Sequence, residues 1–242
     1  MARQASNGPQ RGRPTGWRRW LFPVAAATLV PLLALSLVEL GLRSVGTGHP
    51  SGFFVPVEDQ PAETTNPRFG WRFFPPAIAR SPVVLRLPPA KPAAGYRIFV
   101  LGGSAAMGTP EPAFGFGQVL GVLLRERYPD TDFEVVNAAM AAISSHVALE
   151  IARDCARRRP DLFAVYLGNN EVVGPYGPGT VFAPAGTGLP AIRLGLRLRR
   201  LRGGQLLARG LTAIRRPPAA PTRWRGMEMF QDRRLAASDP RL

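Results

Sequence analysis

The sequence has 242 residues, of which 45% are hydrophobic, and a formal net charge of +15 at pH 7, so it is long enough to bury one sizeable core. The charge lies at the two ends: residues 1–20 contain five Arg and no acid, residues 193–242 contain thirteen Arg and three acids, and residues 21–192 contain 13 basic and 13 acidic side chains. A neutral central part argues against nucleic acid as a partner, and the single cysteine, Cys155, excludes an intrachain disulfide and a multi-cysteine zinc site. We predict no cofactor and no metal site.

The N-terminal region has the composition of a membrane anchor. Residues 21–38 form an almost uninterrupted apolar run, and extension to Leu42 gives the roughly 20 residues that span a bilayer. Arginines precede the run and only Arg43 follows it closely, so the positive-inside rule predicts a basic cytoplasmic tail at 1–20 and a transmembrane anchor at 21–43. The main domain is then extracytoplasmic or periplasmic, held at the inner membrane. A cleaved signal peptide is the alternative, but the run is long and no small-x-small site follows it.

Residues 44–94 are rich in proline and show little periodicity. A short extended segment, VVLRL at 83–87, is the exception. We predict a Pro-rich tether here, a solvated linker with some β structure packed on the following domain.

From Tyr96 onward, short apolar runs alternate with segments of helical periodicity. The predicted strands cover 96–101, 133–137 and 162–167, and the predicted helices cover 116–128 and 146–158. Strands that alternate with single helices form βαβ units, which require a parallel sheet because each crossover needs a dozen or more residues. The sequence therefore predicts an α/β domain whose site lies at the carboxyl ends of the strands.

The three predicted strands end in small or polar residues, GGSAAMG, NAAMAAISS and GNNEVVG. Because parallel strands end at one edge of a sheet, we expect Ser104, the backbone near Ala139, and Asn169 or Asn170 to converge there. A serine nucleophile needs an exposed hydroxyl on a tight turn and donors aimed at the oxyanion of the tetrahedral intermediate. The serine, the backbone N–H groups and the asparagine side chains supply these parts.

Other glycine-rich motifs do not fit the segment around Ser104. A dinucleotide-binding G-x-G-x-x-G that starts at Gly102 needs glycine at positions occupied by Ser104 and Met107. A P-loop needs a lysine, and none is near. The nucleophile elbow G-x-S-x-G is missed by one residue, Ala106.

GGSAAMG, NAAM and GNNE, in this order and each at a strand end, resemble the first three sequence blocks of the SGNH, or GDSL-like, hydrolase superfamily. The resemblance covers residues 95–185 and implies a flavodoxin-like three-layer sandwich. It implies that Ser104 is the nucleophile and first oxyanion donor, that Asn170 is the side-chain donor, and that the backbone N–H of Ala139 is a further donor.

The resemblance extends to residues around these three. Gly168 forms the turn of the third block, and Gly103, His146 and Asn169 are expected to line the pocket. The sequence departs from the family at three points: Ala139 stands for the glycine of the second block, GGS for GDS, and Glu171 for the aspartate of the third block. None of these changes removes a required catalytic group.

The family's catalytic base is missing from the sequence. The family carries it in a late Asp-x-x-His block, but no histidine follows His146. A serine without a base is a poor nucleophile. We therefore expect residues 95–185 to be the N-terminal half of the hydrolase domain, with a parallel sheet that is incomplete, and residues 186–242 to be a basic helical arm or lid that is truncated.

Two alternative catalytic groups are weaker. His146 follows the second block and is an alternative base, but a histidine at a helix N-terminus is more often structural or pocket-lining, and no carboxylate partner is evident. Cys155 lies on the apolar face of its predicted helix and is expected to be a buried core thiol. Residues 191–216 mix Leu and Arg at near-helical spacing, which suits a helix lying on anionic lipid, a lid or a solvated face.

The predicted function is that of a membrane-anchored, extracytoplasmic serine esterase, acylhydrolase or acyltransferase. It acts through an acyl-enzyme on esters of a lipid or a surface polysaccharide, with its base supplied from outside these residues. The alternative is a non-catalytic SGNH-like binding or scaffold protein, or an inactive fragment. Its expected partners are the ester substrate and the membrane, reached through residues 21–43.

Overall fold

The computed structural model describes residues 16–88, 90–92, 94–182, 188–215, 223–233, 235–236 and 238–239. The chain divides into two compact units, Met1–Thr47 and Gly48–Leu242.

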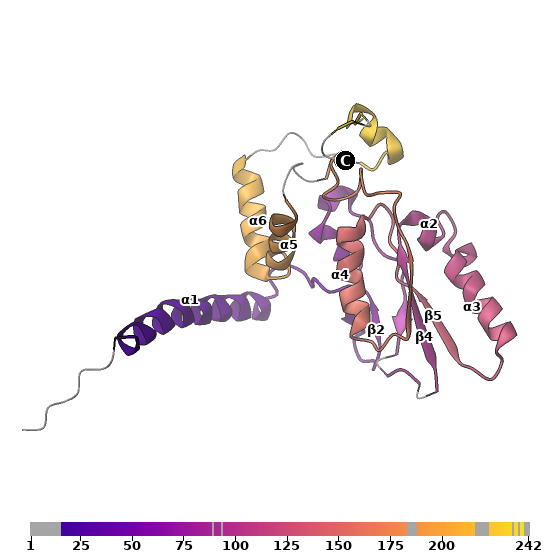
Figure 1. Cartoon of the computed structure of the whole chain (residues 1–242), viewed down its shortest axis with the longest axis horizontal. Coiled ribbons are helices and arrows are strands. Elements are labelled where there is room, and N and C mark those ends of the chain that lie inside the picture. The colour runs from indigo at the N-terminus through magenta and orange to yellow at the C-terminus, as the bar shows by residue number, and fades with distance from the viewer. Residues whose placement is uncertain are drawn as a thin grey trace, which may run out of the picture. The chain divides into compact units, whose positions relative to one another are not determined.

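The first unit contains one long helix, α1 (Arg18–Ser44), labelled in Figure 1. Its segment Trp20–Ser44 contains an 18-residue window with a mean hydropathy of 2.3, and none of that window is buried in the protein. By length and composition this helix is able to cross a membrane, as predicted, although an N-terminal signal sequence meets the same criteria. Glu39, near its end, forms an ion pair with Arg43 at 2.8 Å. The predicted basic tail falls mainly on residues 1–15, which lie outside the described residues.

A three-stranded parallel sheet forms the centre of the second unit. Its strands are β4 (Tyr96–Gly102), β5 (Phe133–Asn137) and β6 (Leu162–Tyr166), in the spatial order β5-β4-β6. The predicted helices are α3 (Phe116–Arg127) and α4 (Ser145–Ala156). The structure confirms the predicted α/β class and the parallel sheet.

Helices cover both faces of this sheet. On one face Val100 of β4 packs with Ala106 and Ala139, and on the other Phe99 belongs to the core that contains Ile151 of α4. Figure 1 shows α2 (Ser104–Met107) and α3 on one side of the strands and α4 on the other. The strand order explains this arrangement. The connection from β4 to β5 runs along the sheet in one direction and the connection from β5 to β6 runs in the other. Because both connections are right-handed, their helices lie on opposite faces.

The segment that we predicted to be a Pro-rich tether with some β structure packed on the domain contributes strands and also buried aromatic side chains to the second unit. It forms an antiparallel sheet of β1 (Phe54–Pro56), β2 (Glu63–Thr65) and β3 (Arg86–Leu87). Phe53, Phe69 and Phe73, which we call the aromatic cluster, are at most 1% exposed. Their ring centroids lie 5.1 Å apart from Phe53 to Phe69 and 5.1 Å from Phe69 to Phe73. Burying three phenylalanines removes several hundred Å² of apolar surface from water, which stabilises this segment against the domain.

Short 3-10 helices complete the second unit. They are η1 (Phe69–Arg72), η2 (Pro76–Ile78), η3 (Pro112–Phe114) and η4 (Gly226–Arg233).

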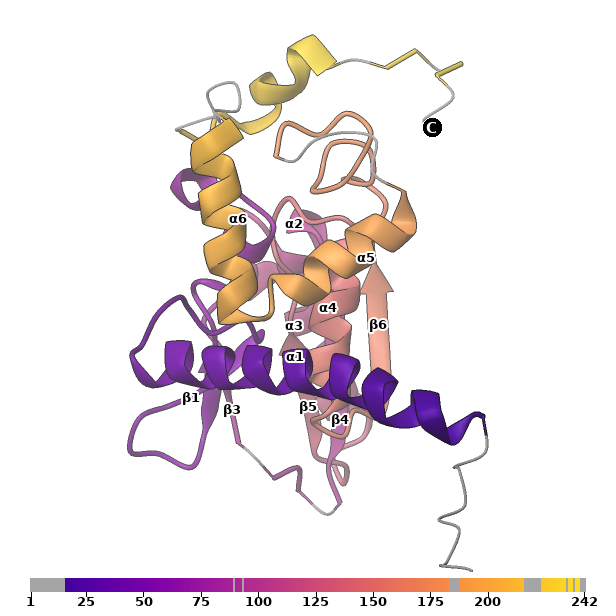
Figure 2. The same cartoon turned by 90° about the vertical axis from the view of Figure 1, so that its left-hand side faces the viewer.

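The basic arm, which we treated as one near-helical stretch, is a pair of helices, α5 (Leu189–Leu198) and α6 (Arg202–Arg215). Figure 2 shows the two joined by a short turn, from which they run in different directions. Ile192 and Leu196 of α5 are buried in the same core as the aromatic cluster. Gly204 permits the sharp turn between the helices, because a Cβ there would lie 1.9 Å from the carbonyl oxygen of Leu198.

A buried ion network holds η1, α4 and the turn after α5 together. Arg72 pairs with Glu150 at 2.6 Å, and their side chains are only 1% and 3% exposed. Arg200 reaches the same carboxylate oxygen at 2.8 Å. Asp154, one turn further along α4, accepts a hydrogen bond of 2.6 Å from the backbone N–H of Phe53. Because unpaired buried charges are costly, these contacts fix the partners in one arrangement.

Candidate active site

The ends of the three parallel strands meet at one edge of the sheet. Gly102, the last residue of β4, is in register with Tyr166 of β6, and Val100 is in register with Asn137 of β5. A pocket opens at this edge. Its lining residues are Gly103, Ser104, Ala105, Ile143, Tyr166, Leu167, Gly168, Asn169 and Asn170. The pocket is small, with a volume of about 10 Å³, which is room for about one water molecule.

Ser104 stands on a sharp turn between β4 and α2. Gly102 ends the strand, and a Cβ there would lie 2.3 Å from both the Ala106 methyl carbon and the Tyr166 carbonyl oxygen. No other residue fits without displacing the backbone. Ser104 is the first residue of α2 and is half-buried. Within the described part of the chain, its hydroxyl forms no hydrogen bond, so it remains available to a ligand.

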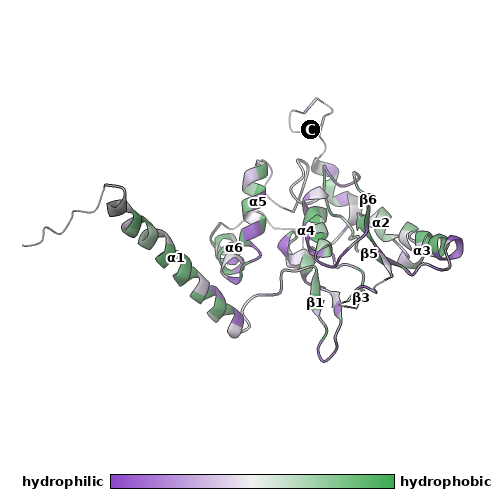
Figure 3. Ribbon diagram, turned by 60° about the horizontal axis from the view of Figure 1, so that its bottom comes forward, coloured by the Kyte–Doolittle hydropathy of each residue, from purple (hydrophilic) through white to green (hydrophobic). Residues whose placement is uncertain are grey.

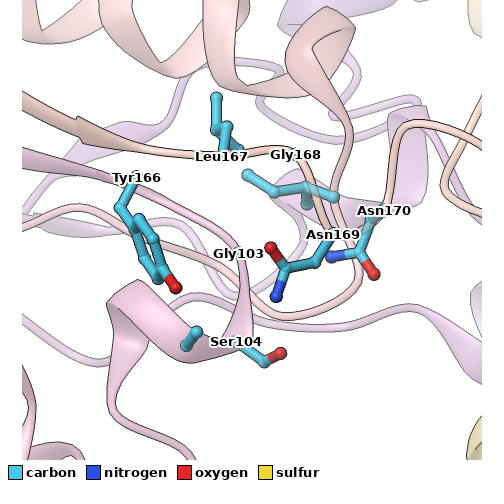
Figure 4. A pocket seen from close by; sticks show the side chains of 9 residues that line it. Gly103, Ser104, Tyr166, Leu167, Gly168, Asn169 and Asn170 are labelled. Atoms are coloured by element: carbon cyan, nitrogen blue, oxygen red, sulfur yellow. The ribbon is translucent and has the colours of Figure 1, made fainter.

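The loop after β6 brings Gly168, Asn169 and Asn170 to the same pocket. Gly168 has φ of 137°, a backbone conformation that essentially only glycine adopts. The Asn170 amide nitrogen would lie 3.0 Å from a Cβ on Gly103, so the third strand's asparagine sits directly beside the turn that carries the serine. Figure 4 shows the Asn169 and Asn170 side chains near Gly103, on the same side of the turn as Ser104.

Ala139 does not take the position predicted for it. It is fully buried, it does not line the pocket, and its backbone N–H donates to the Asn137 side-chain oxygen at 3.2 Å. An N–H committed in this way is not a free oxyanion donor. From the second strand's loop, Ile143 lines the pocket instead, and next to it Ala142 has φ of 62°, a left-handed conformation that an alanine rarely adopts.

His146 also lies elsewhere than predicted. It lines a second cavity of about 300 Å³ between α4 and α5, not the pocket that contains Ser104. Its ring packs edge-on against Tyr176, with 5.8 Å between the ring centroids. The residues that line the serine pocket include no histidine, aspartate or glutamate. The described structure therefore brings together a serine and amide donors without a base.

Two residues that support the site were missed at the sequence level. Asn137 is 4% exposed, and its amide nitrogen donates to the carbonyl oxygens of Ala106 at 3.1 Å and Met107 at 3.3 Å. It thereby fixes α2 to the end of β5. The sequence did contain a sign of this role: Asn137 is a polar residue at the end of an apolar strand, and such a residue needs a hydrogen-bond partner when it is buried.

Glu171 is the second of these supporting residues. Its carboxylate accepts hydrogen bonds from both the N–H and the hydroxyl of Ser145, each at 2.8 Å. It therefore caps α4, where a carboxylate also interacts favourably with the helix dipole. Ser144 is the N-cap residue, but its hydroxyl donates to the carbonyl of Pro175 at 2.8 Å instead of capping the helix.

Other ionisable groups are structural. Burial raises the pKa of the Cys155 thiol well above its ordinary value, so this residue remains an unreactive thiol in the core. Burial raises the pKa of Glu150, but the hydrogen bond and charge of Arg72, together with Arg200 and Arg153, outweigh it, so that this pKa lies below its ordinary value. Among the described residues, no group of three or more His, Cys, Asp or Glu side chains is arranged to hold a metal ion.

No family model matches the chain, and no curated protein or solved structure is significantly similar to it. The geometry of the site and the sequence blocks around it are therefore the basis for a function.

Proposed function

We propose that this chain carries the nucleophile of an SGNH-like serine esterase or acyltransferase, held at a membrane by α1. The observation that carries the proposal is the proximity of three groups from two strand ends: the Ser104 hydroxyl, the Gly103 turn and the Asn170 amide line one pocket. The strand order β5-β4-β6 supports it, because it corresponds to the first three strands of the flavodoxin-like order 2-1-3-4-5. Orientation with the N-terminus in the cytoplasm and the domain outside follows from the positive-inside rule.

The proposed reaction begins with attack of the Ser104 hydroxyl oxygen on the carbonyl carbon of an ester. The carbonyl oxygen becomes an oxyanion, which accepts hydrogen bonds from the Ser104 N–H and the Asn170 amide. Collapse of the intermediate breaks the bond to the alcohol and leaves the acyl group on Ser104. Water then releases the acid in hydrolysis, whereas a second alcohol takes the acyl group in transfer. Esters of lipids or surface polysaccharides suit a membrane-held domain.

The serine proton needs an acceptor. In this proposal, a base from outside the 242 residues accepts it. Within them, Ser104 reacts slowly, because an unassisted hydroxyl is a weak nucleophile.

A second candidate function follows from the same observation. A pocket without a base also suits a binding or scaffold protein that retains the sandwich and does no chemistry.

A fluorophosphonate probe separates these two functions. We expect slow labelling of the full chain, acceleration by added imidazole as an external base, and loss of labelling in Ser104→Ala. Ser81→Ala is the matched control, because Ser81 is exposed and its hydroxyl donates only to the Pro67 carbonyl. If the folded protein is not labelled even with imidazole, the esterase proposal is wrong and the binding role is favoured.

A further inference from the structure

The helices α5 and α6, here called the hairpin, expose several large apolar side chains. On α6, Leu207, Leu211 and Ile214 are 60%, 41% and 80% exposed. Their spacing of four and three residues places them in one stripe, on the helix face opposite the buried Gln205. Figure 3 shows the hydrophobic and hydrophilic residues that alternate around both helices.

A similar stripe runs along α5. Leu194 and Leu198 are 56% and 43% exposed, and they point away from the face that buries Ile192 and Leu196. One face of α5 is thus packed in the core, one face of α6 carries the buried Gln205, and each helix has an apolar face toward its surroundings. A helix facing water on its outer side would carry polar residues there.

The charge of the hairpin has a single sign. Residues 188–215 contain seven arginines and no acidic residue. Arg193 and Arg197 of α5 are exposed, and in the described structure they form no ion pair or side-chain hydrogen bond. Exposed leucines together with unpaired arginines on amphipathic helices are the pattern of an element that lies in the interface of an anionic bilayer.

The chain also limits how far the hairpin can lie from a membrane. Gln205 on the first turn of α6 holds His49 through two hydrogen bonds, accepting from its N–H at 3.0 Å and donating to its carbonyl at 3.0 Å. His49 follows Ser44, the last residue of the apolar helix, by five residues. Five extended residues span at most about 18 Å. If α1 crosses a membrane, the start of α6 therefore stays close to that membrane's surface.

We propose that the hairpin rests on the anionic surface of the membrane that α1 spans. The leucine stripes enter the upper acyl region, and the arginines pair with lipid phosphates while their aliphatic stems remain in the interface. The proposal depends on α1 crossing the bilayer and is independent of the chemistry of Ser104. It gives the C-terminal basic charge a partner, anionic phospholipid, and it holds the domain against the surface on which its substrates would lie.

The test places an environment-sensitive fluorophore on the full chain, reconstituted in nanodiscs of phosphatidylcholine with or without phosphatidylglycerol. Leu207→Cys carries the label on the hairpin, and the native Cys155 is fully buried and does not compete. Leu123→Cys on α3 is the matched control, because Leu123 is 61% exposed against 60% for Leu207. Leu33→Cys in α1 reports insertion of the anchor.

We expect spin-labelled lipid to quench the fluorophore at 33 and at 207 but not at 123. Quenching at 207 should be several-fold stronger with phosphatidylglycerol, and it should fall by at least half in a chain that also carries Arg193→Gln and Arg197→Gln. An unquenched label at 207 beside a quenched label at 33 overturns the proposal. An unquenched label at 33 also overturns it, because the anchor is then not inserted. A third contrary result is a blue shift of the label at 207 that spin-labelled lipid does not quench and that grows with protein concentration; this would indicate that a second copy covers the hairpin. None of these results affects the fluorophosphonate test.

Discussion

The side-chain amide of Asn137 donates a hydrogen bond of 3.1 Å to the carbonyl oxygen of Ala106. This bond joins the end of β5 to the short helix that begins at Ser104. Because α2 has only four residues, it cannot satisfy its own terminal carbonyls, and the asparagine supplies the missing donor.

Asn137→Ala should therefore destabilise the fold and reduce the reactivity of Ser104. The change leaves the buried Ala106 carbonyl, the partly buried Met107 carbonyl and the buried Ala139 N–H without their side-chain partner, and each fully buried group left this way costs about 1–3 kcal/mol. We expect the free energy of unfolding in urea to fall by at least about 2 kcal/mol and fluorophosphonate labelling to slow. Asn169→Ala, at an exposed position, is the control and should change stability by less than about 0.5 kcal/mol. Equal stability of the two variants would show that Asn137 does not hold α2.

The neighbouring asparagines should differ in their effect on labelling. Asn170→Ala removes the proposed oxyanion donor beside Gly103, and the loss of one such donor slows reaction by about 10²–10³-fold. Asn169→Ala should slow labelling by less than about tenfold. The second-order labelling rate constants of the two variants provide the comparison. If the labelling rate constant is lower for Asn169→Ala than for Asn170→Ala, the oxyanion donor is Asn169.

The buried carboxylate of Glu150 should make stability depend on pH. Its pKa is lower in the folded than in the unfolded state, so the unfolded chain binds the proton more tightly. The stabilisation from Glu150 is then fully present above its unfolded pKa, about 4.3, and is lost as the pH falls through the folded value.

We expect the urea midpoint of the protein to fall as the pH is lowered below about 4.3, with a smaller decrease for Glu150→Gln. At pH 7 this substitution should cost about 3–5 kcal/mol, because it leaves Arg72 buried without its partner charge. Glu126→Gln, at an exposed position on α3, is the control. A Glu150→Gln chain with unchanged pH dependence would rule out this carboxylate as its source.

Ala142→Gly should stabilise the protein. The φ of 62° costs a residue with a Cβ about 1–2 kcal/mol, and glycine avoids this strain. Glycine loses more conformational entropy on folding, about 0.5–1 kcal/mol. We therefore expect the free energy of unfolding to rise by a net amount of at most about 1 kcal/mol. Ala141→Gly, one residue earlier and without a positive φ, should lose about 0.5–1 kcal/mol. Thermal unfolding measures both, and a loss in both variants would mean that the turn is not strained at Ala142.

The parallel sheet was predictable from the sequence because its signal is local. β4 is buried along almost its whole length, and its residues 98–101 form an apolar run closed by glycines. The strands and helices begin and end within one or two residues of the predicted bounds, since periodicity and turn residues determine them.

Burial of the aromatic cluster was not predictable in the same way. Phe53, Phe69 and Phe73 follow no helical or strand period, and they are buried because α4 and α5, far along the chain, cover them. The predicted role of the Ala139 N–H as an oxyanion donor depends in the same way on a contact that the sequence does not reveal. This N–H donates to the Asn137 side chain. Spacing alone places Ser104 and Asn170 at one edge, but side-chain hydrogen bonds decide which backbone groups remain free.

The aromatic cluster has a consequence for how the protein is made. About 140 residues separate Phe53 from Leu196 in the same core, and a ribosome that adds about 5–20 residues per second needs roughly 7–30 s to synthesise them. The three phenylalanine rings therefore emerge before α4 is made, and the core that covers them is complete only when α5 follows. The nascent chain exposes an apolar segment early, which favours capture by a chaperone over folding as the chain leaves the ribosome.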